Sequence, residues 1–254
     1  MKNLIDRQGR LTMKRLILTI AALALGTGTA LAQDTVRIAS EGAYPPWNFI
    51  NDANELDGFE RALGDELCTR AELTCEWVIN DWDTIIPNLV GGNYHAIMAG
   101  MSVTEAREAV ISFTQDYRKP DPSAYVTLAG NDESVINGVV AAQSNTIQSG
   151  YVAETDASLV EFPTPDETIA AVRSGEADAV LADPNFLTPI VEQSNGELIF
   201  IGDRVPIGGG VAQGTRQSDD DLRATFNAAI TEMKEDGSLN ELITKWFGEE
   251  ADLY

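Results

Sequence analysis

The sequence predicts an α/β protein made of two lobes, each a mostly parallel sheet flanked by helices. Short apolar runs of strand length alternate with helical patterns, a rhythm typical of parallel sheets covered by helices. This rhythm occurs twice. The segment TIIPNLVGGNYHAIMAG, which starts at Thr84, is similar to TIAAVRSGEADAVLAD, which starts at Thr168. Both combine a helical pattern, a glycine turn and an apolar strand, so we expect two units of similar build.

Each half contributes predicted strands and helices in alternation. In the first half we expect strands at residues 36–39, 76–79 and 96–99, with helices at 59–68 and 84–90. In the second half we expect strands at 139–142, 160–162 and 177–182, with helices at 147–152 and 168–173. Ligands of open α/β sheets lie beyond the carboxyl ends of the strands. Two such sheets facing each other would therefore enclose a ligand between them.

Two extended segments connect the halves. Residues 118–130 contain helix-breaking Pro and Asp, and residues 203–214 are rich in glycine. Two crossings of this kind form a hinge. They predict a first lobe of residues 33–122 with 209–254 and a second lobe of residues 123–208. Residues 219–236 and 238–247 are amphipathic helices with Ser238 as the expected N-cap of the second, and we expect both to return to the first lobe.

The N-terminus has the pattern of a secretory signal peptide. Lys14 and Arg15 precede the apolar run 16–25, and small residues follow up to Ala32. An N-terminal membrane anchor is the alternative, but the apolar run is short for a span. We expect cleavage after residue 32, with residues 1–12 as a possible upstream extension. This pattern predicts an exported protein.

The charge balance excludes several partner classes. The chain has 17 Lys and Arg against 40 Asp and Glu; removing residues 1–32, with five basic residues and one Asp, leaves 12 against 39, a net charge of about −27. Such an acidic surface repels nucleic acids and anionic membranes. Neither is an expected partner.

The two cysteines, Cys68 and Cys75, form an even pair in a chain predicted to be exported, which suggests a disulfide. A disulfide closing so short a loop stabilises the fold by about 2–3 kcal/mol in the chain-entropy model. A metal site is not expected, because nothing nearby supplies the remaining ligands.

Asp183 follows the apolar strand of the stretch ADAVLADP, residues 177–184. One interpretation is a helix cap, since Asp before Pro is typical of a helix start. The other is a ligand-binding carboxylate at the end of a buried strand. The equivalent strand of the first half ends at Gly100, which places both residues on the same predicted cleft.

Two further motifs supply anion-binding groups. In MSVTEAR, residues 101–107, Ser102 or Thr104 can cap a short helix, and Arg107 offers a fork that matches a carboxylate. A surface Arg in a local pair is the alternative. In AAQSNT, residues 141–146, Asn145 or Thr146 can cap the following helix, either as an ordinary cap or as a second grip on the same anion.

Three aromatic residues stand in loops next to the predicted cleft. Tyr44 and Trp47 lie in SEGAYPPWNF, residues 40–49, and Trp82 lies in NDWDT, residues 80–84. Aromatic rings can enclose an alkyl or guanidinium chain. Packing beneath a loop is the other role, and we assign it to Trp47.

The chain resembles the polar amino-acid-binding proteins of bacterial ABC importers, the extracellular solute-binding protein family 3. The matching stretches, in family order, are YPPWNF, LDGFE, DWDTIIPNL, HAIMAGMSVTEAR, ADAVLAD and EMKEDGSLNELITKWFG. The resemblance implies the two-lobed periplasmic-binding-protein fold of type II with a two-strand hinge. It also implies a periplasmic protein that delivers its ligand to an inner-membrane permease.

The resemblance implies a role for each site residue. Arg107, helped by Ser102 and Thr146, would hold the ligand α-carboxylate. Asp183 and the Gly100 carbonyl would hold the α-ammonium, and Tyr44 and Trp82 would flank the side chain. Glu41 would face a basic side chain. These roles favour arginine, lysine, ornithine, histidine or an opine as ligand. Ala99 and Gly100 lack hydroxyls found in some relatives, which leaves room for an N-substituted ligand.

The expected activity is binding, by a monomer without cofactor, metal or catalytic residue. An enzyme on the same scaffold, such as a dehydratase, is one alternative and would need a general acid or base. Glu41 is the main candidate for that role besides Asp183. A soluble sensing subunit is the other alternative.

Overall fold

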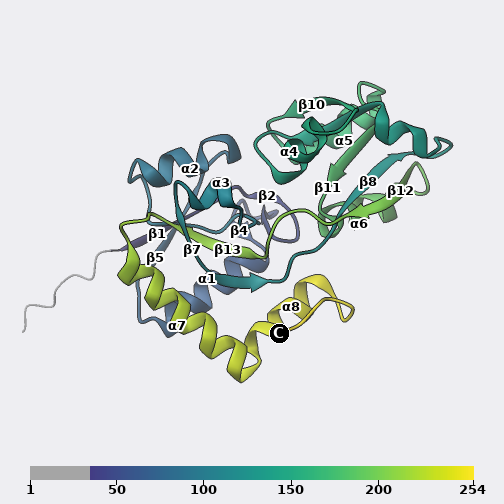
Figure 1. Cartoon of the computed structure of the whole chain (residues 1–254). Helices are drawn as coiled ribbons and strands as arrows, with labels where there is room; N and C mark the ends of the chain where they lie inside the picture. The colour runs from purple at the N-terminus through teal and green to yellow at the C-terminus, as the bar shows by residue number, and fades with distance from the viewer. Residues whose placement is uncertain (1–34) are drawn as a thin grey trace, which may run out of the picture. The chain divides into compact units, whose positions relative to one another are not determined.

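The computed structural model describes residues 35–254, which contain two five-stranded sheets. The first has the order β5-β1-β6-β13-β7. Its parallel part is β5 (Cys75–Ile79), β1 (Val36–Ser40) and β6 (Ala96–Ile97), and β13 (Val211–Thr215) and β7 (Ser112–Arg118) extend it as antiparallel neighbours (Figure 1). The predicted signal peptide, residues 1–32, lies outside the described residues.

The second sheet has the order β10-β9-β11-β8-β12. Its parallel part is β10 (Ser158–Phe162), β9 (Val139–Gln143) and β11 (Ala179–Ala182). The antiparallel strands are β8 (Ser123–Leu128) and β12 (Leu198–Val205). Both lobes therefore have the same plan, three parallel strands followed by two antiparallel ones, as the similarity of the two sequence segments predicted.

Helices pack on both sheets. On the first lobe these are α1 (Phe59–Arg70), α2 (Trp82–Val90), α7 (Asp220–Asp236) and α8 (Ser238–Phe247). On the second lobe they are α4 (Ile147–Ala153), α5 (Pro165–Ser174) and α6 (Pro184–Gln193). Shorter elements are β2 (Ala43–Tyr44), β3 (Asn48–Ile50), β4 (Leu56–Asp57), α3 (Glu105–Glu108) and the 3₁₀-helix η1 (Glu133–Asn137).

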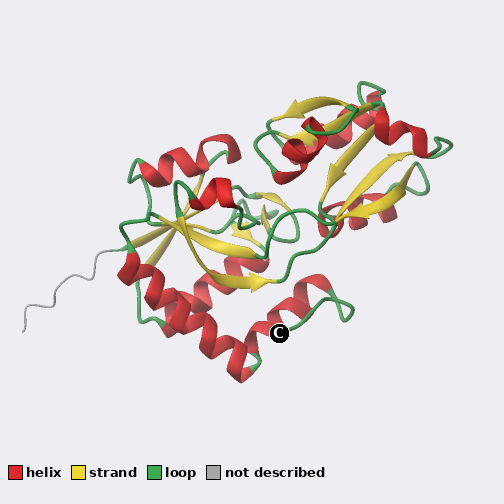
Figure 2. Ribbon diagram, viewed as in Figure 1, coloured by secondary structure: helices red, strands yellow, loops and turns green. Residues whose placement is uncertain are grey.

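The chain crosses between the sheets twice. Residues 119–122 connect β7 to β8, and residues 206–210 connect β12 to β13; Figure 2 draws both crossings as loops. This confirms the predicted two-strand hinge. The exact domain boundaries at residues 122/123 and 208/209 stay a prediction.

The C-terminal helices return to the first lobe as predicted. Helices α7 and α8 pack against α1, and Arg70 of α1 forms an ion pair of 2.6 Å with Asp236 of α7. The predicted N-cap of α8 is wrong by one residue. Gly237 is the cap, with a φ of 83°, and Ser238 is the first helical residue. A left-handed conformation suits glycine, which lets the chain turn sharply between the two helices.

The cysteine pair forms the predicted disulfide. Cys68 near the end of α1 is bonded to Cys75 at the start of β5, with a Cα–Cα distance of 6.2 Å. In the part of the chain that the structure describes, no group of His, Cys, Asp and Glu is arranged to hold a metal ion. Within residues 35–254, no helix combines the length and apolar character needed to span a membrane.

Candidate ligand-binding site

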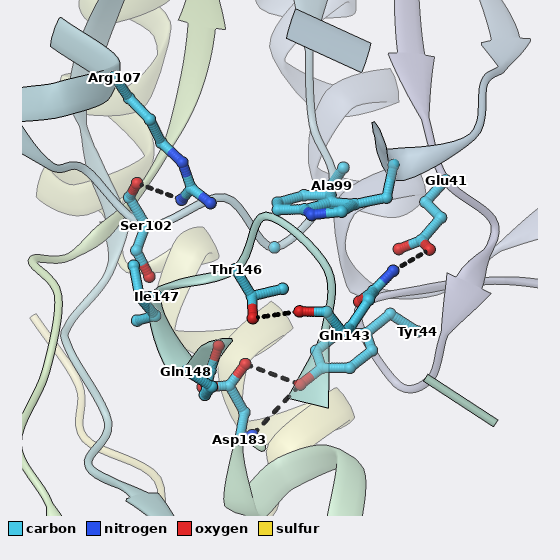
Figure 3. Close-up of a pocket in the computed structure, with 12 residues that line it drawn as sticks. Glu41, Tyr44, Ala99, Ser102, Arg107, Gln143, Thr146, Ile147, Gln148 and Asp183 are labelled. Atoms are coloured by element: carbon cyan, nitrogen blue, oxygen red, sulfur yellow. Dashed lines mark hydrogen bonds between the residues drawn. The ribbon is translucent and has the colours of Figure 1, made fainter. Parts of the chain in front are cut away.

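A cavity lies between the carboxyl ends of the two sheets (Figure 3). All eight ligand-binding residues predicted from the sequence line it. The lining residues are Glu41, Tyr44, Trp82, Ala99, Gly100, Ser102, Arg107, Gln143, Thr146, Ile147, Gln148 and Asp183.

Arg107 brings a positive charge to the cavity without a carboxylate partner among the described residues. Thr104 caps α3 and accepts a hydrogen bond from the Arg107 backbone. The guanidinium donates to the carbonyl oxygens of Ser102 at 2.8 Å and Asn145 at 3.2 Å, and it lies 5.2 Å from the ring centroid of Trp82. Burial lowers the pKa of Arg107 to about 10, so the side chain remains a cation at neutral pH. A cation bound only by carbonyl oxygens and a ring is suited to an anionic ligand group.

Asp183 stands at the N-cap position of α6, but its side chain does not cap the helix. Its carboxylate instead accepts hydrogen bonds from the Tyr44 hydroxyl at 2.8 Å and from Gln148 Nε2 at 3.1 Å. Burial raises the pKa of Asp183 to about 6. Asp183 is therefore the N-cap residue, as the first interpretation predicted, but its side chain makes no capping hydrogen bond and lines the cavity, as the second one predicted.

Glu41 supplies a second carboxylate. Gln143 Nε2, from the second sheet, donates to Glu41 Oε1 at 2.6 Å. Burial raises the pKa of Glu41 to about 7, and the nearby carboxylates of Asp81, Asp83 and Glu60 act in the same direction. No Lys or Arg of the described chain forms an ion pair with Glu41 or with Asp183. The two carboxylates therefore favour a cationic partner.

The aromatic residues have different partners. Tyr44 stacks on Phe186 of α6, with ring centroids 4.7 Å apart and planes at 17°. Trp82 carries the Arg107 guanidinium on its face. Trp47 is buried against Phe59 and Phe247, which confirms the packing role assigned to it.

Thr146 is the N-cap of α4 and not a free hydroxyl. Its Oγ1 accepts from Ser149 N–H at 3.1 Å and donates to the Gln143 carbonyl at 2.7 Å. On the other side of the cavity, Gly100 has a φ of 61°, a conformation that glycine adopts without strain. The prediction that these residues meet at one site is confirmed by the geometry, while their contacts with a ligand stay a prediction.

The sequence interpretation missed Gln143 and Gln148 as lining residues. Both are buried, yet both side chains donate to cavity carboxylates. Gln143 is the last residue of a buried strand, and Gln148 lies in the first turn of the next helix. A polar residue at the carboxyl end of a buried strand is the signal that identifies Gln143, and Gln148 has no such signal.

The comparisons with known proteins agree with this geometry. Residues 36–249 match the model of bacterial extracellular solute-binding proteins, family 3. The octopine-binding periplasmic protein of Rhizobium meliloti is 31% identical over 282 residues, with 89% of this chain and 95% of that protein covered. The lysine/arginine/ornithine-binding periplasmic protein of Escherichia coli is 28% identical over 255 residues, with 92% and 97% covered.

A solved structure shows the same fold at higher identity. The crystal structure of a periplasmic His/Glu/Gln/Arg/opine family-binding protein from Silicibacter pomeroyi, in complex with lysine, is 65% identical and has a TM-score of 0.84. The alignment covers 86% of this chain and all of that one. The family match spans most of the sequence and includes both lobes and the cavity. The chain therefore belongs to the bacterial extracellular solute-binding proteins, family 3.

Proposed function

We propose that the protein is the periplasmic substrate-binding component of an ABC importer and that its ligand is an amino acid with a cationic side chain. One observation carries the proposal. The cavity combines the Arg107 guanidinium with the Glu41 and Asp183 carboxylates, and among the described residues none of the three forms an ion pair.

The charges of the cavity and of such a ligand are complementary. An α-carboxylate would face Arg107, an α-ammonium would face Asp183, and a side-chain cation would face Glu41. Burying a charge without a partner costs several kcal/mol or more, so a site that closes over a ligand needs a partner for each charge. A neutral side chain would leave the Glu41 carboxylate without its counter-ion. The site therefore favours arginine, lysine or ornithine over neutral amino acids.

The relatives support this ligand class. They are named as binding proteins for octopine and for lysine, arginine and ornithine, and the solved structure described above holds lysine. An opine is the alternative ligand. Ala99 and Gly100 line the cavity with little side chain, which leaves space for a substituent on the α-nitrogen.

We propose closure of the two lobes as the mechanism. Residues 33–122 with 209–254 would move as one lobe and residues 123–208 as the other, about the crossings at 119–122 and 206–210. Hydrogen bonds already join the lobes beside the cavity, from Gln143 to Glu41 and from Tyr44 to Asp183. A ligand that bridges the same groups would stabilise the closed arrangement, which is a population shift. A permease would then recognise the closed monomer in the periplasm.

An enzyme on this scaffold is the alternative activity that one observation favours. The pKa of Glu41, raised to about 7, is in the range of a general base. We propose binding without chemistry, because the relatives are named as binding proteins. Mass spectrometry of the recovered ligand distinguishes the two, since a binding protein returns it unchanged. A sensing subunit would bind in the same way but would pass its signal to another protein.

The test is a thermal-shift screen over the amino acids and opines, followed by calorimetry. A ligand present at 100 times its Kd stabilises the folded state by about 2.7 kcal/mol. We expect the largest increases in Tm with arginine, lysine, ornithine or an opine. A screen in which acidic or neutral amino acids stabilise the protein more than all of these would contradict the proposal.

A further inference from the structure

We propose that Glu60, which lies beneath the cavity and does not line it, is a positioning residue that holds together the two segments of the first lobe that carry the site. One segment is residues 41–48, with Glu41 and Tyr44; the other is the turn at Gly100. The proposal rests on the proposed function, because positioning is defined here by its effect on ligand affinity.

Glu60 is fully buried in the first turn of α1, and three different donors surround its carboxylate. The Gly100 N–H lies 2.8 and 2.9 Å from its two oxygens. Asn48 Nδ2 donates to Oε2 at 2.8 Å, and the Tyr117 hydroxyl donates to Oε1. Burial raises the pKa of Glu60 above its ordinary value, and these hydrogen bonds oppose that shift. An ionised carboxylate is acceptor-only, so it fits a site in which all partners donate.

Asn48 carries the connection to the ligand-facing residues. While its Nδ2 donates to Glu60, its Oδ1 accepts the Gly42 N–H at 2.7 Å. Gly42 follows Glu41 directly in the chain. The orientation of the Asn48 amide is therefore fixed by Glu60 on one side, and it fixes the backbone next to Glu41 on the other.

Backbone hydrogen bonds from the start of α1 also bind the segment of residues 41–48. The N–H groups of Phe59 and Glu60 donate to the carbonyl oxygens of Pro46 and Trp47, both at 2.9 Å. These are N–H groups that the helix itself leaves unpaired. One residue, Glu60, thus binds residues 42–48 through its backbone and side chain and binds Gly100 through its carboxylate.

A glutamine at position 60 would break this arrangement without changing its volume. In either orientation its Nε2 would face the Gly100 N–H, which donates to both oxygens of Glu60. On the Oε2 side it would also face the Asn48 amide, whereas on the Oε1 side it could donate to the Tyr117 hydroxyl. If Asn48 rotated its amide to accept from glutamine, its own NH₂ would face the Gly42 N–H. An unsatisfied buried donor costs free energy, and a shift of the backbone would relieve that cost. The shift would move Glu41, although every charge that faces the ligand would be retained.

Calorimetry with arginine on the full mature chain tests the proposal. We expect Glu60→Gln to weaken binding by about tenfold or more, in line with the cost of one unsatisfied buried donor. The control is Ile243→Val, a buried residue of α8 outside the network, which lowers stability and should leave the Kd unchanged. Wild-type affinity in folded Glu60→Gln would overturn the proposal. Absence of binding by the wild type to arginine, lysine, ornithine and the opines alike would instead count against the proposed function.

A second variant, Asn48→Ala, keeps the proposal testable if Glu60→Gln does not fold or if arginine is not the ligand. It removes only the connection between Glu60 and Gly42. In ¹H–¹⁵N spectra of the ligand-free protein, we expect the amide signals of Glu41 and Gly42 to shift with those of Gly100. Signals of Glu41 and Gly100 that stay at their wild-type positions would overturn the proposal, because a positioning residue must act on both segments.

Discussion

The Tyr44 hydroxyl donates a hydrogen bond of 2.8 Å to Asp183, a residue 139 positions later in the chain and on the other lobe. The same hydroxyl accepts the Asp183 N–H at 3.2 Å. Tyr44 is therefore hydrogen-bonded to the carboxylate that we expect to bind the ligand ammonium. A ligand ammonium has to join or replace this contact.

Replacing Asp183 with asparagine removes the charge and keeps the shape. The side-chain amide oxygen that Asp183→Asn introduces can still accept from Tyr44, so the lobes retain their contact. We expect arginine binding to weaken by about tenfold or more, because an ammonium loses its charged partner. Calorimetry measures the change. Asp156→Asn, at an exposed position of the same lobe, is the control and should bind as the wild type does. Equal affinities of the two variants would reject the role of Asp183.

Glu41→Gln tests which ligand group faces this side chain. The variant should lose affinity for arginine and lysine by about tenfold and lose little for a neutral amino acid of similar length such as glutamine. The measurement is the ratio of the Kd values for arginine and glutamine in each protein. If the substitution left this ratio unchanged, Glu41 would not discriminate between ligand side chains.

Binding should depend on pH through the two cavity carboxylates. Their pKa values are raised to about 7 for Glu41 and about 6 for Asp183, and a cationic ligand binds their ionised forms. We expect arginine binding to weaken about tenfold or more between about pH 8 and pH 5.5, with release of protons on binding near pH 6.5. Calorimetry in two buffers of different ionisation enthalpy measures that release. Proton uptake or a flat profile would contradict the prediction.

The same shifts predict how the stability of the ligand-free protein changes. A carboxylate whose folded-state pKa is raised stabilises the folded protein below its ordinary pKa, and this contribution is lost as the pH rises through the raised value. For Glu41 the window extends from 4.5 to about 7. Glu41→Gln should therefore flatten the decrease of the unfolding free energy over that window, which urea titrations at several pH values would measure.

The disulfide should affect stability and not affinity. Cys68 and Cys75 connect the end of α1 to the start of β5, and neither lines the cavity. Replacing both with serine should lower the unfolding free energy by about 2–3 kcal/mol in the chain-entropy model. The Kd for arginine should be unchanged. A weaker Kd would mean that the position of α1, and with it Glu60, depends on the disulfide.

The parallel parts of both sheets could be predicted because their strands and helices have local periodicity. Strand β7, SFTQDYR, could not, because it has no apolar run and its pairing with β13 connects residues about a hundred positions apart. The start of helix α6 was predicted only as one of the two interpretations of Asp183, and its extent could not be predicted. The helix contains Pro189 in its interior, a residue that usually ends a helix.

Asp183 and Arg107 could be predicted from the sequence pattern, because one follows a strand and the other lies in the first turn of a helix, whereas Glu41 was indicated by the family resemblance. Their partners could not. The contact between Tyr44 and Asp183, and the one between Gln143 and Glu41, depend on how the two lobes face each other. The connection of Glu60 to Gly100 and Asn48 is likewise visible only in the folded chain.

The central claim is that Arg107 neutralises the ligand carboxylate, and a cycle of two proteins and two ligands tests it most directly. Arginine and agmatine differ only in the α-carboxylate, and Arg107→Ala removes its proposed partner. By calorimetry, we expect the wild type to bind arginine about a hundredfold more tightly than agmatine. The variant should show little or no preference between the two ligands. A preference that survives the removal of Arg107 would contradict the account.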